Sequence, residues 1–236
     1  MIKQKVYFFF ILTLILTTVN AQNAVNQFDK DGKRHGLWTK NYHKTDQIRY
    51  KGNFRHGKEI DTFKYYTLSN GKSVLSATKV FNDKDSIAEV IFYTSKKKII
   101  SKGKMNGKLY IGEWVYYHKN TSQIMITENF NDKGNLEGER TVFYESGKIA
   151  EQTFYEDGKL NGVCKWFYKS GKPLRQSHYK DDLLNGKTIN YDPDGNIISE
   201  GDYEKDMKAG IWKYYKNGKI TKEIDHTKQK VIKKYE

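Results

Sequence analysis

The feature that most constrains this chain is a unit of about 24 residues that recurs along most of its length. Tyrosines mark the repeat near the end of each aromatic cluster, and successive members are 23 to 27 residues apart. These tyrosines are Tyr42, Tyr66, Tyr93, Tyr117, Tyr144, Tyr168, Tyr191 and Tyr215. A sustained period of this length indicates a repeat architecture, in which each unit is stabilised by its neighbours.

Glycines divide each unit into short segments. One glycine column consists of Gly36, Gly57, Gly107, Gly138, Gly162, Gly186 and Gly210. A second set of glycines follows Asn, Asp or Ser, as in Asn70-Gly71, Ser170-Gly171 and Asp194-Gly195, and such pairs supply the positive φ angles of tight hairpin turns. The segments between the turns are five to seven residues long and rich in Tyr, Trp, Phe, Ile and Val, which is typical of strands.

We therefore predict an all-β chain. Its expected form is an elongated, single-sheet, solenoid-like array of about eight stacked β-hairpin repeats of about 24 residues. One hairpin alone is not stable in water, whereas stacked neighbours can bury their aromatic rings in a continuous row. A helix is expected nowhere except at the C-terminal tail, because the frequent glycines would interrupt it.

Particular phrases in the repeats resemble a known family. The patterns G-x-W-x-Y-Y-x-N-G-K-I at 210–220, F-Y-x-S-G-K at 143–148 and 167–172, and Y-x-D-G-K-L-N-G at 155–162 are similar to the bacterial variant of the MORN repeat, including its YwqK-like antitoxin type. The resemblance covers roughly residues 29–226 and is poorest around 57–111, where Lys96–Lys98 replace the usual turn. It implies stacked β-hairpins, an interaction scaffold and no catalytic residue.

The N-terminus predicts export. Lys3 and Lys5 precede an apolar run from Val6 to Val19, and small residues follow at the position that a signal peptidase recognises. The expected organisation is a signal peptide at 1–21, a linker at 22–28, the repeat domain at 29–227 and a basic tail at 228–236. The competing interpretation is a membrane anchor, but the run is shorter than the roughly 20 residues that span a bilayer.

The one cysteine is expected to be structural. Cys164 lies two residues after a column glycine, at the position that Trp38, Trp114 and Trp212 occupy in other repeats, and no second cysteine can pair with it. His35 and His56 precede glycines and are interpreted as turn residues, not as metal ligands. No metal, cofactor or catalytic set is predicted, so we expect a protein that is not an enzyme.

Strand alternation places aromatic residues on both sheet faces. The candidate binding face comprises Tyr116, Trp166, Tyr214 and Lys213, unless these rings pack only against one another. Export and a net charge of +14 lead us to expect another protein as the partner, including in an immunity-like role, and no nucleic acid. The alternative is an envelope-associated binder of anionic lipid headgroups or acidic glycans. The sequence leaves the oligomeric state open.

Overall fold

The computed structural model describes residues 25–82, 84–119 and 121–235, so the predicted signal peptide lies outside the described residues. Regular structure in the described residues consists of strands alone. These are β1 (Gln27–Phe28), β2 (Arg34–Asn41), β3 (Ile48–Arg55), β4 (Lys58–Ser69), β5 (Lys72–Phe81), β6 (Ile87–Tyr93), β7 (Ile99–Asn106), β8 (Leu109–Tyr117), β9 (Ile124–Phe130), β10 (Gly138–Phe143), β11 (Ile149–Glu156), β12 (Lys159–Leu160), β13 (Gly162–Phe167), β14 (Pro173–Lys180), β15 (Leu183–Tyr191), β16 (Ile197–Glu204), β17 (Met207–Lys216), β18 (Lys219–Asp225) and β19 (Lys230–Lys234).

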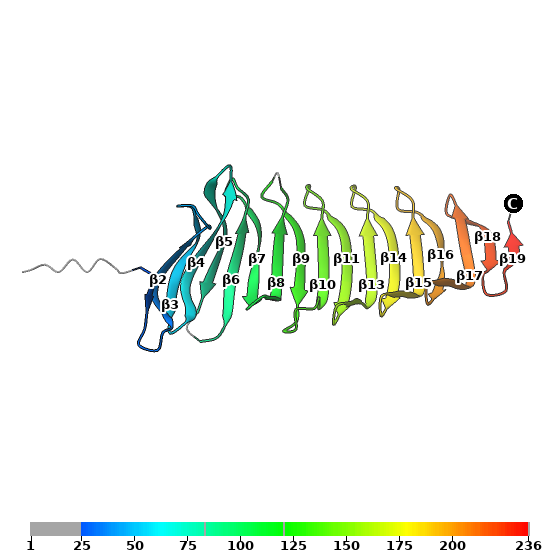
Figure 1. Ribbon diagram of the computed structural model, residues 1–236. Helices are drawn as coiled ribbons and strands as arrows, with labels where there is room; N and C mark the ends of the chain where they lie inside the picture. Colours follow the sequence, from blue (N-terminus) through cyan, green and yellow to red (C-terminus); the bar gives the residue numbers. More distant parts are fainter. Residues whose placement is uncertain (1–24, 83, 120, 236) are drawn as a thin grey trace, which may run out of the picture.

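The strands form one open antiparallel sheet in chain order. Each strand pairs with the next, except that β11 pairs with both β12 and β13, and β13 then pairs with β14. Figure 1 shows the result as one long row of strands from the blue N-terminal end to the red C-terminal end. The prediction of an elongated all-β hairpin array is confirmed.

Two-residue turns form one long edge of the sheet. In the turns Asp181-Asp182 and Lys205-Asp206, both residues have positive φ, as a type I′ turn requires. Asp206 compensates for the absence of glycine by docking on the preceding repeat. Its main-chain N–H donates to the Leu184 carbonyl at 3.0 Å, and its carboxylate accepts the Leu184 N–H at 2.7 Å. Each such turn therefore fastens one repeat to the previous one.

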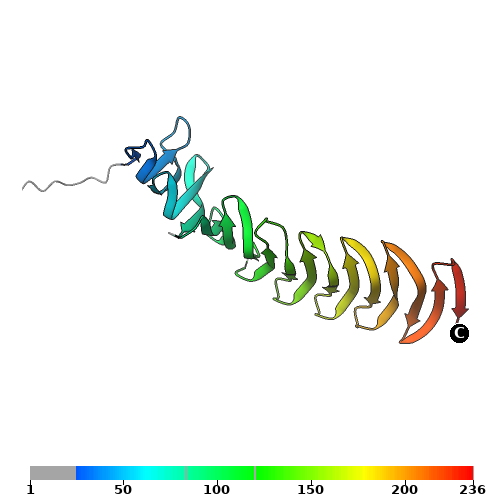
Figure 2. The same ribbon diagram turned by 90° about the horizontal axis from the view of Figure 1, so that it is seen from below.

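Each repeat also contains a β-bulge near the opposite edge. The register skips one residue in the second strand of each hairpin, and these residues include Ile100, Met125, Ala150, Leu174 and Ile198. Bulges bend a strand and increase its twist. Figure 2, which shows the molecule from below, displays the strands as curved ribbons. We call the face that carries the buried rings the inner face and the opposite face the outer face.

A central row of side chains crosses the inner face from strand to strand and forms the core. Following the pairing, its members are Trp38, Gly52, Phe63, Lys79, Val90, Gly103, Trp114, Glu128, Arg140, Thr153, Cys164, Ser177, Thr188, Gly201, Trp212 and Ile224. Phe63, Trp114 and Trp212 are at most 1% exposed. A single-layer sheet buries rings to this extent only because its strands curve around them.

Glycine makes room for each of these three rings. A Cβ added at Gly52, Gly103 or Gly201 would overlap the ring of Phe63, Trp114 or Trp212, respectively. The opposite side of Trp114 and of Trp212 is covered by the side chain of the residue four positions earlier in the chain. Tyr110 stacks on Trp114 with ring centroids 3.9 Å apart, and the Lys208 ammonium lies 4.0 Å from the centre of Trp212. Each tryptophan is thus held between a bare backbone and a covering side chain.

The Cys164 segment of the row uses small residues instead. Cys164 pairs with Ser177, which pairs with Thr188, and all three are at most 1% exposed. The Thr188 hydroxyl donates to the Ser177 hydroxyl at 3.0 Å, which satisfies polar groups that would be costly to bury alone. Cys164 therefore occupies the tryptophan position in a part of the sheet whose neighbours leave no room for a ring.

The tyrosine column divides into two structural positions. One group lies three residues after the central-row residue of its own strand: Tyr66, Tyr93, Tyr117, Tyr191 and Tyr215. The second group lies four residues after it: Tyr42, Tyr144 and Tyr168. The second group links repeats. Tyr42 donates its hydroxyl to the Tyr66 carbonyl at 2.6 Å, Tyr144 to Phe167 at 2.6 Å and Tyr168 to Tyr191 at 2.9 Å. The accepting carbonyl always belongs to the third-position residue of the next repeat.

The glycine column also divides. Gly36, Gly138, Gly162, Gly186 and Gly210 lie two residues before the central row and have positive φ, and Gly112, which the sequence analysis did not include, has this position before Trp114. Gly57 and Gly107 instead lie in turns between strands.

The sheet extends beyond the expected domain limits. β19 lies within the segment expected to be a basic tail, and β1 lies within the expected linker. No helix of the described chain could cross a membrane.

Candidate binding surface

The C-terminal part of the outer face carries alternating charges, whereas the N-terminal part places Lys51 opposite Lys64. Along the C-terminal part, cross-strand pairing places Glu200 opposite Lys213, Lys213 opposite Glu223, and Glu223 opposite Lys233. Opposite charges facing each other across strands stabilise a sheet and cancel much of each other's field. Lys213, which was assigned to the candidate binding face, therefore lies on the outer face, away from Tyr116, Trp166 and Tyr214.

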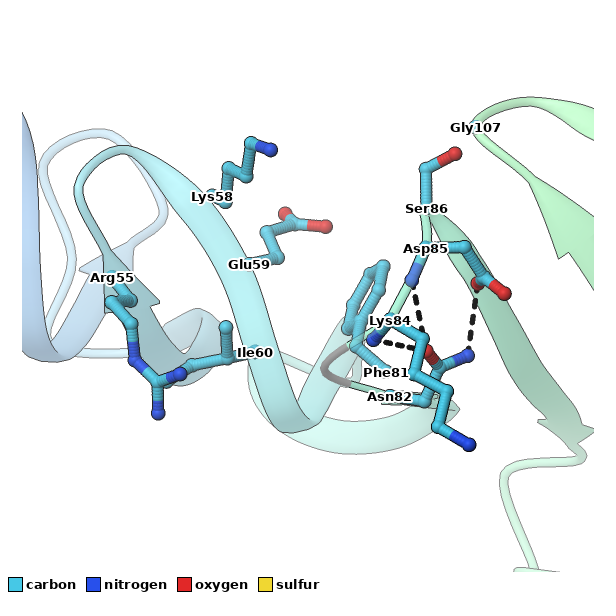
Figure 3. Close-up of a pocket in the computed structure, with 10 residues that line it drawn as sticks. All are labelled: Arg55, Lys58, Glu59, Ile60, Phe81, Asn82, Lys84, Asp85, Ser86 and Gly107. Carbon is cyan, nitrogen blue, oxygen red and sulfur yellow. Dashed lines mark hydrogen bonds between the residues drawn. The ribbon is translucent and has the colours of Figure 1, made fainter.

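A hollow of about 560 Å³ lies at the turn edge, where the loop between β5 and β6 replaces the usual two-residue turn (Figure 3). Most of its polar groups form hydrogen bonds within this loop. The Asn82 side-chain Oδ1 accepts the main-chain N–H groups of Lys84 and Asp85, and the Asp85 carboxylate accepts from the Asn82 side-chain amide and the Ile87 N–H. These bonds hold the Asp85 pKa below its usual value. The hollow is best explained as a consequence of the irregular loop.

A second groove, of about 480 Å³, lies in the regular C-terminal half. Its apolar part consists of Trp166 and Tyr168 with Leu174 and Ile198, and Tyr191 also lines it. Leu174 and Ile198 are the bulged residues of successive repeats and are 39% and 45% exposed. Bulges frequently redirect side chains beside functional sites, and here they direct two aliphatic side chains towards solvent.

Polar residues complete the groove on the inner face. Arg175, Asn190 and Ser199 lie side by side on β14, β15 and β16, because Arg175 pairs with Asn190 and Asn190 with Ser199. They occupy the row that carries rings at Tyr116, Trp166 and Tyr214. Asn190 and Ser199, which are smaller than the rings of this row, leave space beside Trp166. The Asn190 amide donates to the Ser199 hydroxyl at 3.0 Å, so these two groups form one hydrogen-bonding unit.

Arg175 supplies the positive charge of this groove. Its guanidinium carbon lies 5.8 Å from the centre of the Trp166 ring, and its Nε donates to the Ser177 hydroxyl at 2.8 Å. These contacts orient the guanidinium and use only one of its five N–H donors. The Trp166 indole N–H donates to Glu151 at 3.2 Å, which fixes the ring. An oriented guanidinium beside an aromatic ring suits a carboxylate attached to an apolar group.

The other two candidate rings are engaged within the sheet. Burial, followed by the hydrogen bond with Glu128, raises the pKa of Tyr116, and that ring also packs against Trp114. The Tyr214 hydroxyl lies 3.1 Å from His226 Nε2 and accepts a hydrogen bond from Lys208 at 3.3 Å. Trp166 is therefore the candidate residue that lines a groove, while Tyr116 and Tyr214 support the core.

The Cys164 thiol is chemically shielded. It is fully buried, and burial raises the pKa of the thiol, which lowers its thiolate fraction. It lies in the central row between Thr153 and Ser177, and its cross-strand neighbours in the row are hydroxyl side chains. A buried thiol without an activating base is a packing group.

Sequence reasoning missed the groove residues Arg175, Leu174 and Ile198 and the glycines beneath the rings. A signal for the glycines was available, because Gly52, Gly103 and Gly201 each precede their covering ring by 11 residues. The groove had no such signal, since it depends on where a bulge turns the side chains.

A family comparison identifies the repeats. The model of the MORN repeat variant matches residues 136–157, 160–181 and 184–205, which contain β10–β11, β13–β14 and most of β15–β16. No curated protein matches the chain. MORN repeats are generally associated with the binding of proteins or membrane lipids, and this all-β fold is typically a scaffold without enzymatic activity. The groove beside Trp166 lies within the three matched repeats.

Proposed function

Because the chain carries tandem MORN repeat variants, we propose that it is an exported, non-enzymatic scaffold that binds another protein through the groove beside Trp166. The bound element is an extended segment with an apolar side chain and a nearby carboxylate. The carboxylate pairs with Arg175, and the apolar side chain contacts Trp166, Leu174 and Ile198. The Asn190 and Ser199 pair offers hydrogen bonds to the segment's main chain.

One observation carries this proposal. The half-buried Trp166 and the oriented Arg175 guanidinium meet in a groove whose aliphatic residues are exposed to solvent. Aromatic and arginine side chains in a pocket are the residue types that contribute most to binding energy at protein interfaces. Exposed aliphatic residues beside them add apolar area for a partner to cover.

The charge distribution supports a protein partner over an anionic membrane. Membrane attachment through basic residues needs a surface on which positive charges accumulate. Along the C-terminal part of the outer face, lysines alternate with glutamates across the strands, and two facing lysines, Lys51 and Lys64, lie in the N-terminal part. The groove, in turn, lies on the inner face of a curved sheet, which suits a chain segment better than a flat bilayer.

Export and an immunity-like role are the narrower parts of the proposal. The apolar run from Val6 to Val19 supports export through a cleaved signal peptide, to the periplasm, the outer envelope or the medium. In the immunity-like form, the bound segment belongs to a toxin exported by the same cells.

The test compares two sets of variants in affinity capture from the cell envelope fraction. Trp166→Asn with Arg175→Ser removes the groove, and it places at these positions the residues found in the next repeat at Asn190 and Ser199, so the strands should form normally. Lys213→Ala on the outer face is the matched control. We expect the wild-type chain and the control to capture the same partner protein, and the groove variant to capture at least tenfold less of it.

Two results would contradict the proposal. Equal capture by the groove variant would show that the partner binds elsewhere. Salt-sensitive binding of the wild-type protein to phosphatidylglycerol vesicles, without capture of a protein, would favour the lipid alternative. Circular dichroism of each variant checks that the strands have formed.

A further inference from the structure

A group of metal-ligand side chains lies at the N-terminal end of the sheet, far in sequence from the groove. Asp29, His35 and His56 each place one donor atom within 4.8 Å of the donor atoms of the other two. They come from the loop after β1, from β2, and from the turn between β3 and β4. The pairing of β2 with β3 brings the two histidines together, with ring centroids 5.0 Å apart.

The carboxylate of this group is held in place before any ligand arrives. One Asp29 carboxylate oxygen accepts the main-chain N–H groups of Asp31 and Lys33, each at 2.9 Å. The other oxygen lies 2.7 Å from Nδ1 of His56. These contacts fix the carboxylate and keep the pKa of Asp29 below its usual value, with the Lys33 N–H as the largest cause and His56 next.

His56 is held as firmly by its backbone. It occupies the first position of a type I′ turn with φ of 49°, where other repeats have Asp157, Asp181 or Lys205. The N–H of the next residue, Gly57, donates to the Arg34 carbonyl at 2.8 Å and so docks the turn beside His35. The His56 side chain is 61% exposed and the rings face solvent, so an ion can reach them.

We propose that Asp29, His35 and His56 form a binding site for a divalent transition-metal ion such as Zn²⁺. Two imidazoles and one carboxylate, with water in the remaining position, are a common ligand set for such ions. A point equidistant from three atoms 4.8 Å apart lies about 2.8 Å from each of them. Zinc–ligand distances are ~2.0–2.2 Å, so side-chain movements of less than about 1 Å complete the site.

The site would fasten the end of the array. It joins the loop after β1 to the turn after β3, at the first hairpin of the described residues. In the last two matched repeats, the position of His35 is taken by Asn161 and Asn185, and that of His56 by Asp181 and Lys205. Within the described repeats, the ligand set therefore belongs to the N-terminal end.

The test is calorimetric titration of the purified protein, made without a histidine tag, with ZnCl₂. His35→Asn introduces the residue of the equivalent repeats, and His56→Asn introduces a residue that adopts positive φ at Asn70 and Asn217, so both variants should keep the fold. Asp29→Asn retains the oxygen that accepts the loop N–H groups. His43→Asn, in the exposed loop after β2, is the control.

We expect one zinc ion per chain, at least tenfold weaker binding in each of the three variants, and unchanged binding in the control. Zinc should raise the midpoint of thermal unfolding of the wild-type protein and of the control, but not of the three variants. The Co²⁺-loaded wild-type protein should show the visible absorption of a nitrogen- and oxygen-ligated ion. Absent binding, or binding that survives His35→Asn and His56→Asn, would overturn the proposal.

Discussion

At the scale of single residues, this sheet depends on placing each large buried ring against a glycine, which has no side chain. Trp114 and Trp212 rest on Gly103 and Gly201, and each indole N–H donates to the carbonyl of the residue after that glycine, at 3.0 and 2.9 Å. The glycine is required here by close approach. At Cys164 the neighbouring positions carry the side chains of Thr153 and Ser177 in place of glycine, so the residue between them must be small.

Gly201→Ala should lower the free energy of unfolding by about 1–3 kcal/mol, because the added methyl group overlaps the buried Trp212 ring and forces it to move. Urea unfolding followed by tryptophan fluorescence measures this change. Unchanged stability would show that the ring does not lie on the glycine.

A double-mutant cycle at the Cys164 position provides the control. Cys164→Trp alone should destabilise the protein because Thr153, the residue 11 positions earlier, occupies the space that a ring needs. Adding Thr153→Gly should recover part of that loss, although glycine alone weakens a strand. Additive losses in the cycle would contradict the packing rule.

At the scale of the hairpin, much of the structure could be predicted from the sequence. The strands, the turns and the stacking follow from the Tyr and Gly periods, which are local properties of the chain. The faces could not be assigned fully, because a bulge in every repeat shifts the alternation of side chains by one residue. Tyr168 and Tyr191 looked equivalent in sequence but differ in role, because Tyr168 is the fourth residue after the central row and Tyr191 is the third.

The candidate site shows the same limit. Trp166 was identified by its aromatic character and its strand position. Arg175, Asn190 and Ser199 join it only through cross-strand pairing, and Leu174 turns towards solvent only because it is the bulged residue. Likewise, His35 and His56 fitted turn positions, and only the pairing of β2 with β3 brings them to Asp29.

Tyr168→Phe should lower the free energy of unfolding by about 1 kcal/mol, because it removes the 2.9 Å hydrogen bond from the hydroxyl to the Tyr191 carbonyl of the next repeat. Tyr191→Phe is the matched control, since its hydroxyl makes none of the hydrogen bonds found among the described residues. Chemical denaturation of both variants gives the comparison. Equal losses would mean that the hydroxyl contact does not link the repeats.

At the scale of the whole molecule, stability and function both follow from one sheet that grows in one direction. Each repeat contacts mainly its neighbours, so the groove beside Trp166 and the metal-ligand cluster at Asp29 lie in different repeats and can be changed independently. The protein offers a long inner face with local sites, in contrast to a globular protein with one central cavity.

Small-angle X-ray scattering of the purified protein tests this account most directly. Successive strands about 4.8 Å apart make the sheet about 80 Å long, which corresponds to a radius of gyration of about 25 Å. A compact globule of this chain length would have a radius of gyration of about 17 Å. We predict the larger value, with the pair-distance distribution of a rod, and a value near 17 Å would contradict the single extended sheet.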